Sequence, residues 1–196
     1  MTNRFSFSQI LLLVFACVGV LFVSSCEDDD DPEIPNESEL ITDVVYTLSP
    51  TVAGVEPVIM NFRDRDGDGG MEPTRSVSGT LRANMSYTGS LILQSVEADG
   101  TVEDITAEVL VESLEHQVFY TKSGGLNLTL TYGDSDPDGN PLGLVTDATT
   151  GAASSGKLTV ILRHEPNKTA SGISIDNPSV AGGETDIQVE FDLTIQ

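Results

Sequence analysis

The chain has 196 residues, of which 31 are Asp or Glu and only 9 are Lys or Arg, so its formal net charge at pH 7 is -22. Nucleic acids and anionic membrane surfaces are bound by clustered basic side chains, whereas the basic residues here are scattered singly among acids. The composition therefore argues against both kinds of partner. A hydrophobic content of 39% without a single Trp is compatible with one lean core, so we expect one folded domain.

An apolar run at residues 10–23 follows a short N-terminal segment whose only basic side chain is Arg4. A basic start, a short apolar stretch and small residues after it are typical of a secretory signal peptide. The run is too short to span a membrane comfortably. We therefore predict that residues 1–25 are a signal, which is removed together with Cys17.

The signal ends in Val23, Ser24, Ser25 and Cys26. This order resembles the lipobox of bacterial lipoproteins, in which the cysteine becomes the mature N-terminus and carries diacylglycerol and an N-linked acyl chain. The resemblance implies lipidation of Cys26. Each buried methylene contributes about 0.8 kcal/mol, so two or three chains hold a protein on a membrane essentially permanently. The alternative is an ordinary signal followed by an incidental free cysteine, which would leave an unpaired thiol in a secreted chain.

The residues after Cys26 are mainly acids, with two prolines among them. Like charges with prolines repel one another and bury no apolar surface, so residues 26–39 are predicted to be an acidic, disordered tether. An acidic stretch directly after a lipidated cysteine also resembles the surface-export signal of Bacteroidetes lipoproteins. That resemblance implies display on the outer leaflet of the outer membrane, and a periplasm-facing anchor is the alternative.

From Leu40 onward, short runs with two-residue periodicity predict β-strands. The clearest is 187–195, where apolar residues alternate with polar ones and place Asp186 and Gln188 on a solvent-facing side. The other predicted strands are 41–48, 58–62, 76–81, 87–93, 116–120, 126–132, 142–145 and 158–162. About nine short strands separated by Gly, Pro, Asn and Asp are typical of an antiparallel sandwich or barrel. We predict an all-β fold over residues 40–196, an antiparallel β-sandwich of Ig-like or jelly-roll-like type.

One segment, 104–115, has helical periodicity. Its apolar positions at i, i+3, i+4 and i+7 are Ala107, Leu110, Val111 and Leu114, and the opposite side carries Glu108, Glu112 and Glu115. This pattern predicts a single short helix that packs its apolar side on or between the sheets. Asp104 near the start suits the positive end of the helix dipole.

Two loops, 61–70 and 131–140, repeat three carboxylates at alternate positions before a glycine. These carboxylates are Asp64, Asp66 and Asp68 in the first loop and Asp134, Asp136 and Asp138 in the second. Calcium binds about six to eight oxygen ligands, and alternate Asp side chains in a curled loop can converge on one ion. The spacing is similar to the first half of an EF-hand loop, but the closing glutamate is missing, so Glu72 or backbone carbonyls would complete the first site. The alternative is a pair of solvated Asp-Gly turns.

The two histidines, His116 and His164, are further candidate ligands. Both could bind zinc together with an acid, or one or both could bind haem iron. The alternative is two strand-terminal histidines satisfied by hydrogen bonds. The chain has neither a zinc-protease motif nor a nucleophile elbow, so we do not predict an enzyme.

Over nearly its full length the chain is similar to small outer-membrane lipoproteins of Bacteroidetes, especially flavobacteria. The similarity rests on Cys26 with its acidic tether and on segments 64–69, 115–120, 163–168 and 182–186. Members are often labelled as the type 1 periplasmic binding fold superfamily. That label implies two lobes of alternating parallel strands and helices, whereas the strand pattern here predicts an antiparallel sandwich.

Members of the group are similar to lipoproteins found beside TonB-dependent receptors. The resemblance therefore implies a lipid-anchored, surface-exposed binding or accessory module that assists such an outer-membrane receptor in the uptake of a nutrient, a metal or haem. Two alternatives stay open. A calcium-braced structural or adhesive module would show calcium-dependent stability. A secreted hydrolase would need converging carboxylates or a His-centred site in a concave pocket.

Overall fold

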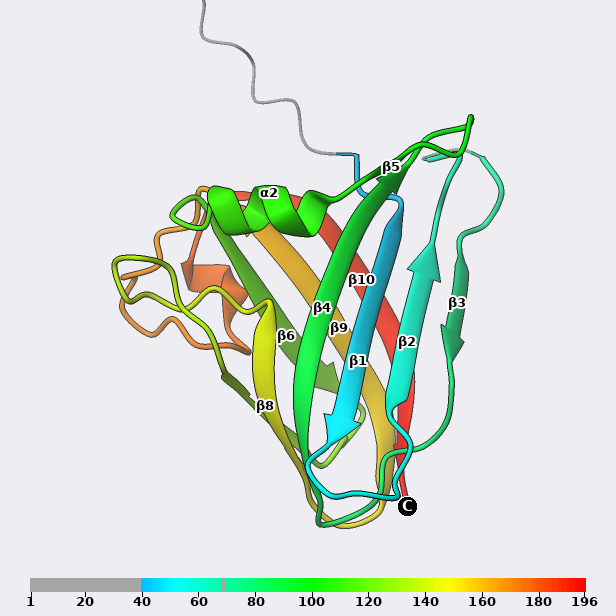
Figure 1. The fold of residues 1–196 in the computed structure, drawn as a ribbon. Coiled ribbons are helices and arrows are strands. Elements are labelled where there is room, and N and C mark those ends of the chain that lie inside the picture. Colours follow the sequence, from blue (N-terminus) through cyan, green and yellow to red (C-terminus); the bar gives the residue numbers. More distant parts are fainter. Residues whose placement is uncertain (1–39, 68–69) are drawn as a thin grey trace, which may run out of the picture. The chain divides into compact units, whose positions relative to one another are not determined.

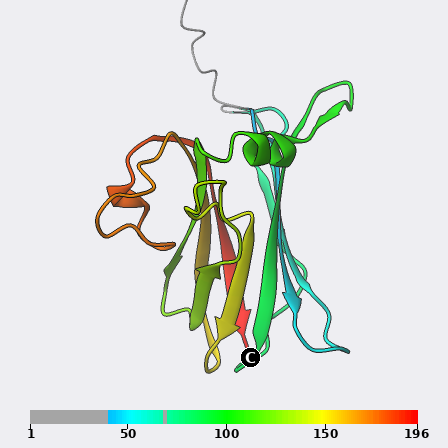
Figure 2. The same cartoon turned by 60° about the vertical axis from the view of Figure 1, so that its left-hand side comes forward.

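The computed structural model describes residues 40–67 and 70–196. The predicted signal peptide, Cys26 and the tether lie outside the described residues, as does Asp68. The described residues form two antiparallel sheets that pack face to face, which confirms the predicted all-β sandwich (Figures 1 and 2). Among these residues, no helix has both the length and the apolar character needed to cross a membrane.

The larger sheet has seven strands among the described residues. These are β1 (Asp43–Pro50), β2 (Val58–Arg63), β3 (Thr74–Val77), β4 (Ser86–Val96), β5 (Val102–Glu103), β7 (Leu128–Tyr132) and β8 (Val145–Thr150). Their order is β3-β2-β1-β4-β8-β7, and β5 pairs with the end of β4. The register places Asp43 of β1 opposite Arg63 of β2 and Gln94 of β4, so the described chain enters the sheet where β4 ends.

The smaller sheet contains β6 (His116–Ser123), β9 (Ser154–His164) and β10 (Glu184–Ile195), with β9 in the middle. His116, the first residue of β6, lies directly opposite His164, the last residue of β9. On the other side of β9, Glu184 also lies opposite His164, and the register then shifts between Thr185 and Ile187. This shift is a β-bulge, and it decides where the side chain of Asp186 points.

Alternate residues of both sheets point inward and form one core. Two tyrosines connect the layers: the rings of Tyr46 on β1 and Tyr120 on β6 have centroids 5.0 Å apart, and both residues are fully buried. Their hydroxyls are satisfied inside the core, since Tyr46 shares a hydrogen bond with Thr146 and Tyr120 donates to the carbonyl of Gly143. Large buried aromatic rings whose hydroxyls are hydrogen-bonded contribute strongly to the stability of a core.

The predicted helix is present as α2 (Ile105–Val111), which lies across the end of the sandwich where β4 finishes (Figure 1). Asp104 lies at its start, as expected, and also caps it, because the Asp104 side chain accepts a hydrogen bond from the backbone N–H of Ala107. A short 3₁₀ turn, η1 (Pro178–Val180), precedes β10.

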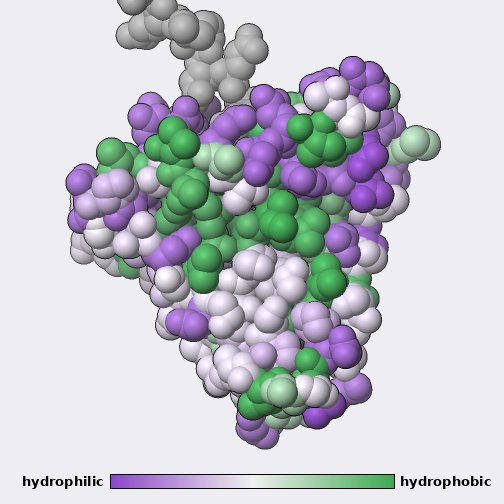
Figure 3. Space-filling view, in the orientation of Figure 1, coloured by the Kyte–Doolittle hydropathy of each residue, from purple (hydrophilic) through white to green (hydrophobic). Residues whose placement is uncertain are grey.

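The predicted buried side of the helix is wrong. Its buried residues are Ile105 and Val109, whereas Leu110, Val111 and Leu114 have exposed fractions of 61%, 85% and 53%. The physical reason is a tertiary contact: the Thr106 hydroxyl bonds the backbone N–H and C=O of Leu93 and so fixes which side of the helix meets β4. Figure 3 shows apolar surface in this part of the molecule, including a patch below α2 over the adjoining ends of β4 and β1.

Candidate functional site

A buried polar cluster lies at one end of the smaller sheet. The register of β6 and β9 brings the two histidines together, with 3.0 Å between His164 Nδ1 and His116 Nε2 and with the rings edge to face. His116 is fully buried and His164 is 8% exposed. The two residues that the sequence offered separately as candidate ligands therefore form a single site.

The third member of the cluster is Asp186, which the sequence analysis had placed on the solvent face of β10. The bulge turns this residue inward, so its side chain is only 3% exposed and its Oδ2 lies 3.9 Å from His116 Nε2. A strict alternation of apolar and polar residues along the strand does not predict that such a side chain points inward. The sequence signal that could have found it is the Gly182-Gly183 pair before the strand. Gly183 has a φ of +70°, and a Cβ there would overlap the carbonyl oxygen of His164.

The environment of Asp186 disfavours the negative charge of its carboxylate. Burial raises its pKa, and the nearby imidazoles of His116 and His164 offset part of that rise. Its Oδ2 is buried and accepts no hydrogen bond from the described residues. A buried oxygen without a partner is costly, so this position favours a proton or a cation.

The ring of His116 is held in one orientation by the end of α2. Its Nδ1 lies 3.2 Å from the backbone carbonyl of Glu112, the C-cap residue of the helix. Because a carbonyl only accepts, Nδ1 carries the proton, and the lone pair of the neutral ring is on Nε2. That lone pair is on the nitrogen that faces His164 and Asp186.

Two imidazole nitrogens and one carboxylate oxygen therefore converge, with the three ligand atoms within 4.8 Å of one another. This set of donors matches zinc and similar transition metals, whereas calcium prefers oxygen ligands alone. Asp186 also lines an open groove of about 600 Å³ whose walls include Ile41, Phe62, Arg75 and Ile187. The cluster can hold a small cation and adjoins a concave surface that is open to solvent.

The first acidic loop forms hydrogen bonds within itself. Asp64 Oδ1 accepts a hydrogen bond from the N–H of Gly67 at 3.1 Å, and Asp66 Oδ2 accepts one from the N–H of Met71 at 2.7 Å. Hydrogen bonds of this kind are typical of Asp-rich turns. In the described part of this loop, Asp64 and Asp66 are therefore paired with backbone N–H groups.

Across residues 40–67 and 70–196, only the histidine cluster brings three or more possible ligand side chains so close together. Asp64, Asp66 and Glu72 are not brought together in this way, and Asp68 lies outside the described residues. Calcium binding at the first loop stays a prediction.

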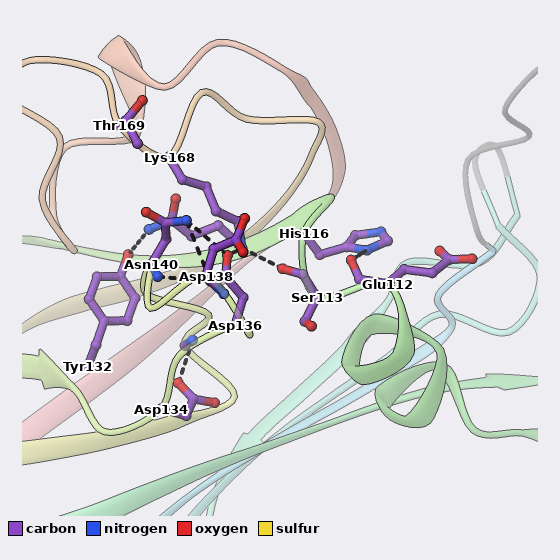
Figure 4. Close-up of polar contacts among 12 residues, drawn as sticks. Glu112, Ser113, His116, Tyr132, Asp134, Asp136, Asp138, Asn140, Lys168 and Thr169 are labelled. Atoms are coloured by element: carbon purple, nitrogen blue, oxygen red, sulfur yellow. Dashed lines mark hydrogen bonds and ion pairs between the residues drawn. The ribbon is translucent and has the colours of Figure 1, made fainter.

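The carboxylates of the second loop point to different partners (Figure 4). Asp134 accepts hydrogen bonds from the N–H groups of Gly143 and Val145, at 2.6 and 2.9 Å. Asp136 and Asp138 do not converge with it, and Asp138 is exposed. The geometry therefore gives no support to the predicted calcium site at this loop.

Asp136 instead forms a buried ion pair. Its Oδ1 accepts from the N–H groups of Asp138 and Asn140, and its Oδ2 lies 3.0 Å from Lys168 Nζ, which also donates to the carbonyl of Ser113 (Figure 4). Burial alone would raise the pKa of Asp136, but the hydrogen bonds from Lys168 and Asn140 outweigh it and hold the pKa below its usual value. The lysine ammonium supplies the positive charge that an ion would have brought.

Comparison with protein-family models, with curated proteins and with solved structures finds no match. The similarity to Bacteroidetes outer-membrane lipoproteins stays a prediction. Function has to be inferred from the residues of this chain.

Proposed function

We propose that this protein is a lipid-anchored binding module of the bacterial outer membrane, displayed at the cell surface, where it assists a TonB-dependent receptor in uptake. One observation carries the proposal. Val23, Ser24, Ser25 and Cys26 are followed directly by an acidic stretch and then by a single β-sandwich. A lipidated cysteine, a self-repelling tether and a folded domain are the parts that such a module needs.

The cysteine content supports the anchor. The described domain contains no cysteine, since Cys17 and Cys26 both precede it. The described sandwich therefore keeps its fold without a disulfide, and Cys26 remains available for lipid. The tether gives the domain reach, because residues 27–39 can span at most about 45 Å when fully extended.

The groove beside β10 supports a binding role over a purely structural one. Its lining combines apolar side chains such as Phe62 and Ile187 with the charged side chains of Arg75 and Asp64. Arg75 is already held in place, with its guanidinium 5.1 Å from the centre of the Phe62 ring. A concave surface that combines apolar and charged side chains can bind a polar small molecule or a peptide.

The anchor is tested by replacing each cysteine separately. Wild type and Cys17→Ala should incorporate radioactive palmitate and fractionate with the outer membrane, because Cys17 leaves with the signal. Cys26→Ala should incorporate none. Labelling of Cys26→Ala at the wild-type level, or an unlabelled wild type, would contradict the anchor.

Display and partnership need separate measurements. Protease added to intact cells should degrade the domain while a periplasmic control protein survives, and survival of the domain would place it on the inner side. Cross-linking in native outer membranes, followed by purification through the domain, should enrich a TonB-dependent receptor. Recovery of the lipoprotein without such a receptor would remove the accessory role.

A further inference from the structure

We propose that His116, His164 and Asp186 form a binding site for one divalent transition-metal ion of the zinc type. The site is built from β6, β9 and β10, within the sandwich. It does not depend on Cys26 or on any receptor, so this proposal and the proposed function can fail separately.

The distances suit an ion with short metal-ligand bonds. Zinc binds imidazole nitrogen at about 2.0–2.1 Å, so two nitrogens on a tetrahedral ion lie about 3.3 Å apart. The two histidine nitrogens are 3.0 Å apart, and Asp186 Oδ2 is 3.9 Å from His116 Nε2. Shifts of roughly half an ångström or less would bring all three atoms to bonding distance around one ion.

The unpartnered carboxylate oxygen is an independent indication of a ligand. Asp186 Oδ2 is buried in a side chain only 3% exposed, yet it accepts no hydrogen bond from the described residues. A structural aspartate at such a depth normally has donors, as Asp136 has in this same protein. Asp186 therefore has the coordination capacity that a bound cation would use.

The outer contacts of the site are also those of a metal centre. Ligating histidines usually donate their second ring N–H to a carbonyl or carboxylate, which fixes the ring and its tautomer. His116 makes this contact through Nδ1 to the carbonyl of Glu112. The tight approach of Gly183 to His164 and the bulge at Asp186 bring the third ligand to the same point.

The donor set also predicts selectivity. Two nitrogens and one carboxylate favour zinc, nickel or copper over calcium and magnesium, which prefer oxygen ligands. Three protein ligands leave a fourth position for water or for a ligand. Asp186 also lines the groove of about 600 Å³, so the site lies beside this concave surface.

The experiment is a calorimetric titration of the full-length chain in detergent with zinc chloride. Wild type should bind one ion per chain, and excess calcium should not displace it. Asp186→Asn and His164→Gln should each lower the affinity by more than about 100-fold, beyond the 10- to 100-fold typical of outer-shell changes. The matched control is Asp192→Asn, also on β10 but with a side chain 89% exposed, which should bind like wild type.

Folding is checked on the same samples by circular dichroism without metal. Asp186→Asn keeps the shape of the side chain and removes a buried charge, so it should fold. If His164→Gln does not fold, the zinc affinity of Asp186→Asn alone tests the site. Zinc binding by Asp186→Asn at wild-type affinity, or no binding by wild type, would overturn the proposal. The second result would leave a histidine pair joined by a shared hydrogen bond, without metal.

Cobalt substitution separates this site from the cysteines. Cobalt held by nitrogen and oxygen should give visible bands without the ultraviolet thiolate-to-metal absorption that cysteine ligands produce. Bands that persist in Asp186→Asn, or thiolate absorption in wild type, would place the ion elsewhere and overturn the assignment.

Discussion

Breaking the buried ion pair between Asp136 and Lys168 should destabilise the sandwich strongly. The two side chains are 0% and 5% exposed, and Asp136→Asn would leave the lysine ammonium buried without its counter-ion. Losing one partner of a buried pair costs about 3–5 kcal/mol of unfolding free energy. Lys168 keeps its hydrogen bond to the carbonyl of Ser113, so we expect a loss of about 3 kcal/mol, near the lower end of that range.

Chemical denaturation at pH 7, followed by circular dichroism, measures this loss. The matched control is the exposed pair Lys157–Glu190, whose side chains are 47% and 46% exposed, so Glu190→Gln should cost far less than Asp136→Asn. For a domain of this size, a loss of 3 kcal/mol lowers Tm by about 6–12 °C. Equal losses for Asp136→Asn and Glu190→Gln would refute the reasoning.

The loss of unfolding free energy in Asp136→Asn should become smaller at acidic pH. The folded state holds the pKa of Asp136 below its ordinary value, so the stability contributed by its charge is present above the unfolded-state pKa of about 3.9. It disappears as the pH falls through the lower, folded-state pKa. The stability difference between wild type and Asp136→Asn should therefore be full at pH 7 and shrink below about pH 4. A difference that grows on acidification would contradict the ion pair.

The remaining predictions use the same denaturation assay. Asp138→Asn should change stability by no more than about 0.5 kcal/mol, with calcium or with chelator, because its side chain is exposed and does not converge with its neighbours; a calcium-dependent loss would restore the second calcium site. Gly143→Ala should cost about 1–3 kcal/mol, since φ is +98° and a Cβ would lie 2.8 Å from the carbonyl oxygen of Val118; an unchanged midpoint would show that the loop relaxes freely. Zinc at one hundred times its Kd should add about 2.7 kcal/mol to wild type and nothing to Asp186→Asn; an equal gain in both would place the ion elsewhere.

The strands could be predicted from the sequence because most of them alternate apolar and polar residues. β8 (Val145–Thr150) lies further along the chain than the strand predicted there. The run 142–145 reads as a strand, but Leu142 and Leu144 are buried in a loop, where their carbonyls accept hydrogen bonds from β6 and β4, and the strand begins only at Val145. The inward positions of β8 are Thr146, Ala148 and Thr150, which hydrophobic periodicity does not recognise as core.

The site was harder to predict from the sequence than the fold, because it depends on strand register and on one β-bulge. His116 and His164 meet only because β6 and β9 pair with those two residues opposite each other. Asp186 joins them only because the register slips by one residue between Thr185 and Ile187. The alternation of apolar and polar residues carries neither fact, and only the Gly182-Gly183 pair hints at the bulge. The second Asp loop failed to form the expected cluster for a similar reason, since Lys168, distant in sequence, neutralises Asp136.

The most direct test of the membrane-anchored module is the intact mass of the protein extracted from native outer membranes. The account predicts a chain that begins at Cys26 and carries diacylglycerol and an amide-linked acyl group. A mass that includes residues 1–25, or an unmodified cysteine at the N-terminus, would contradict it.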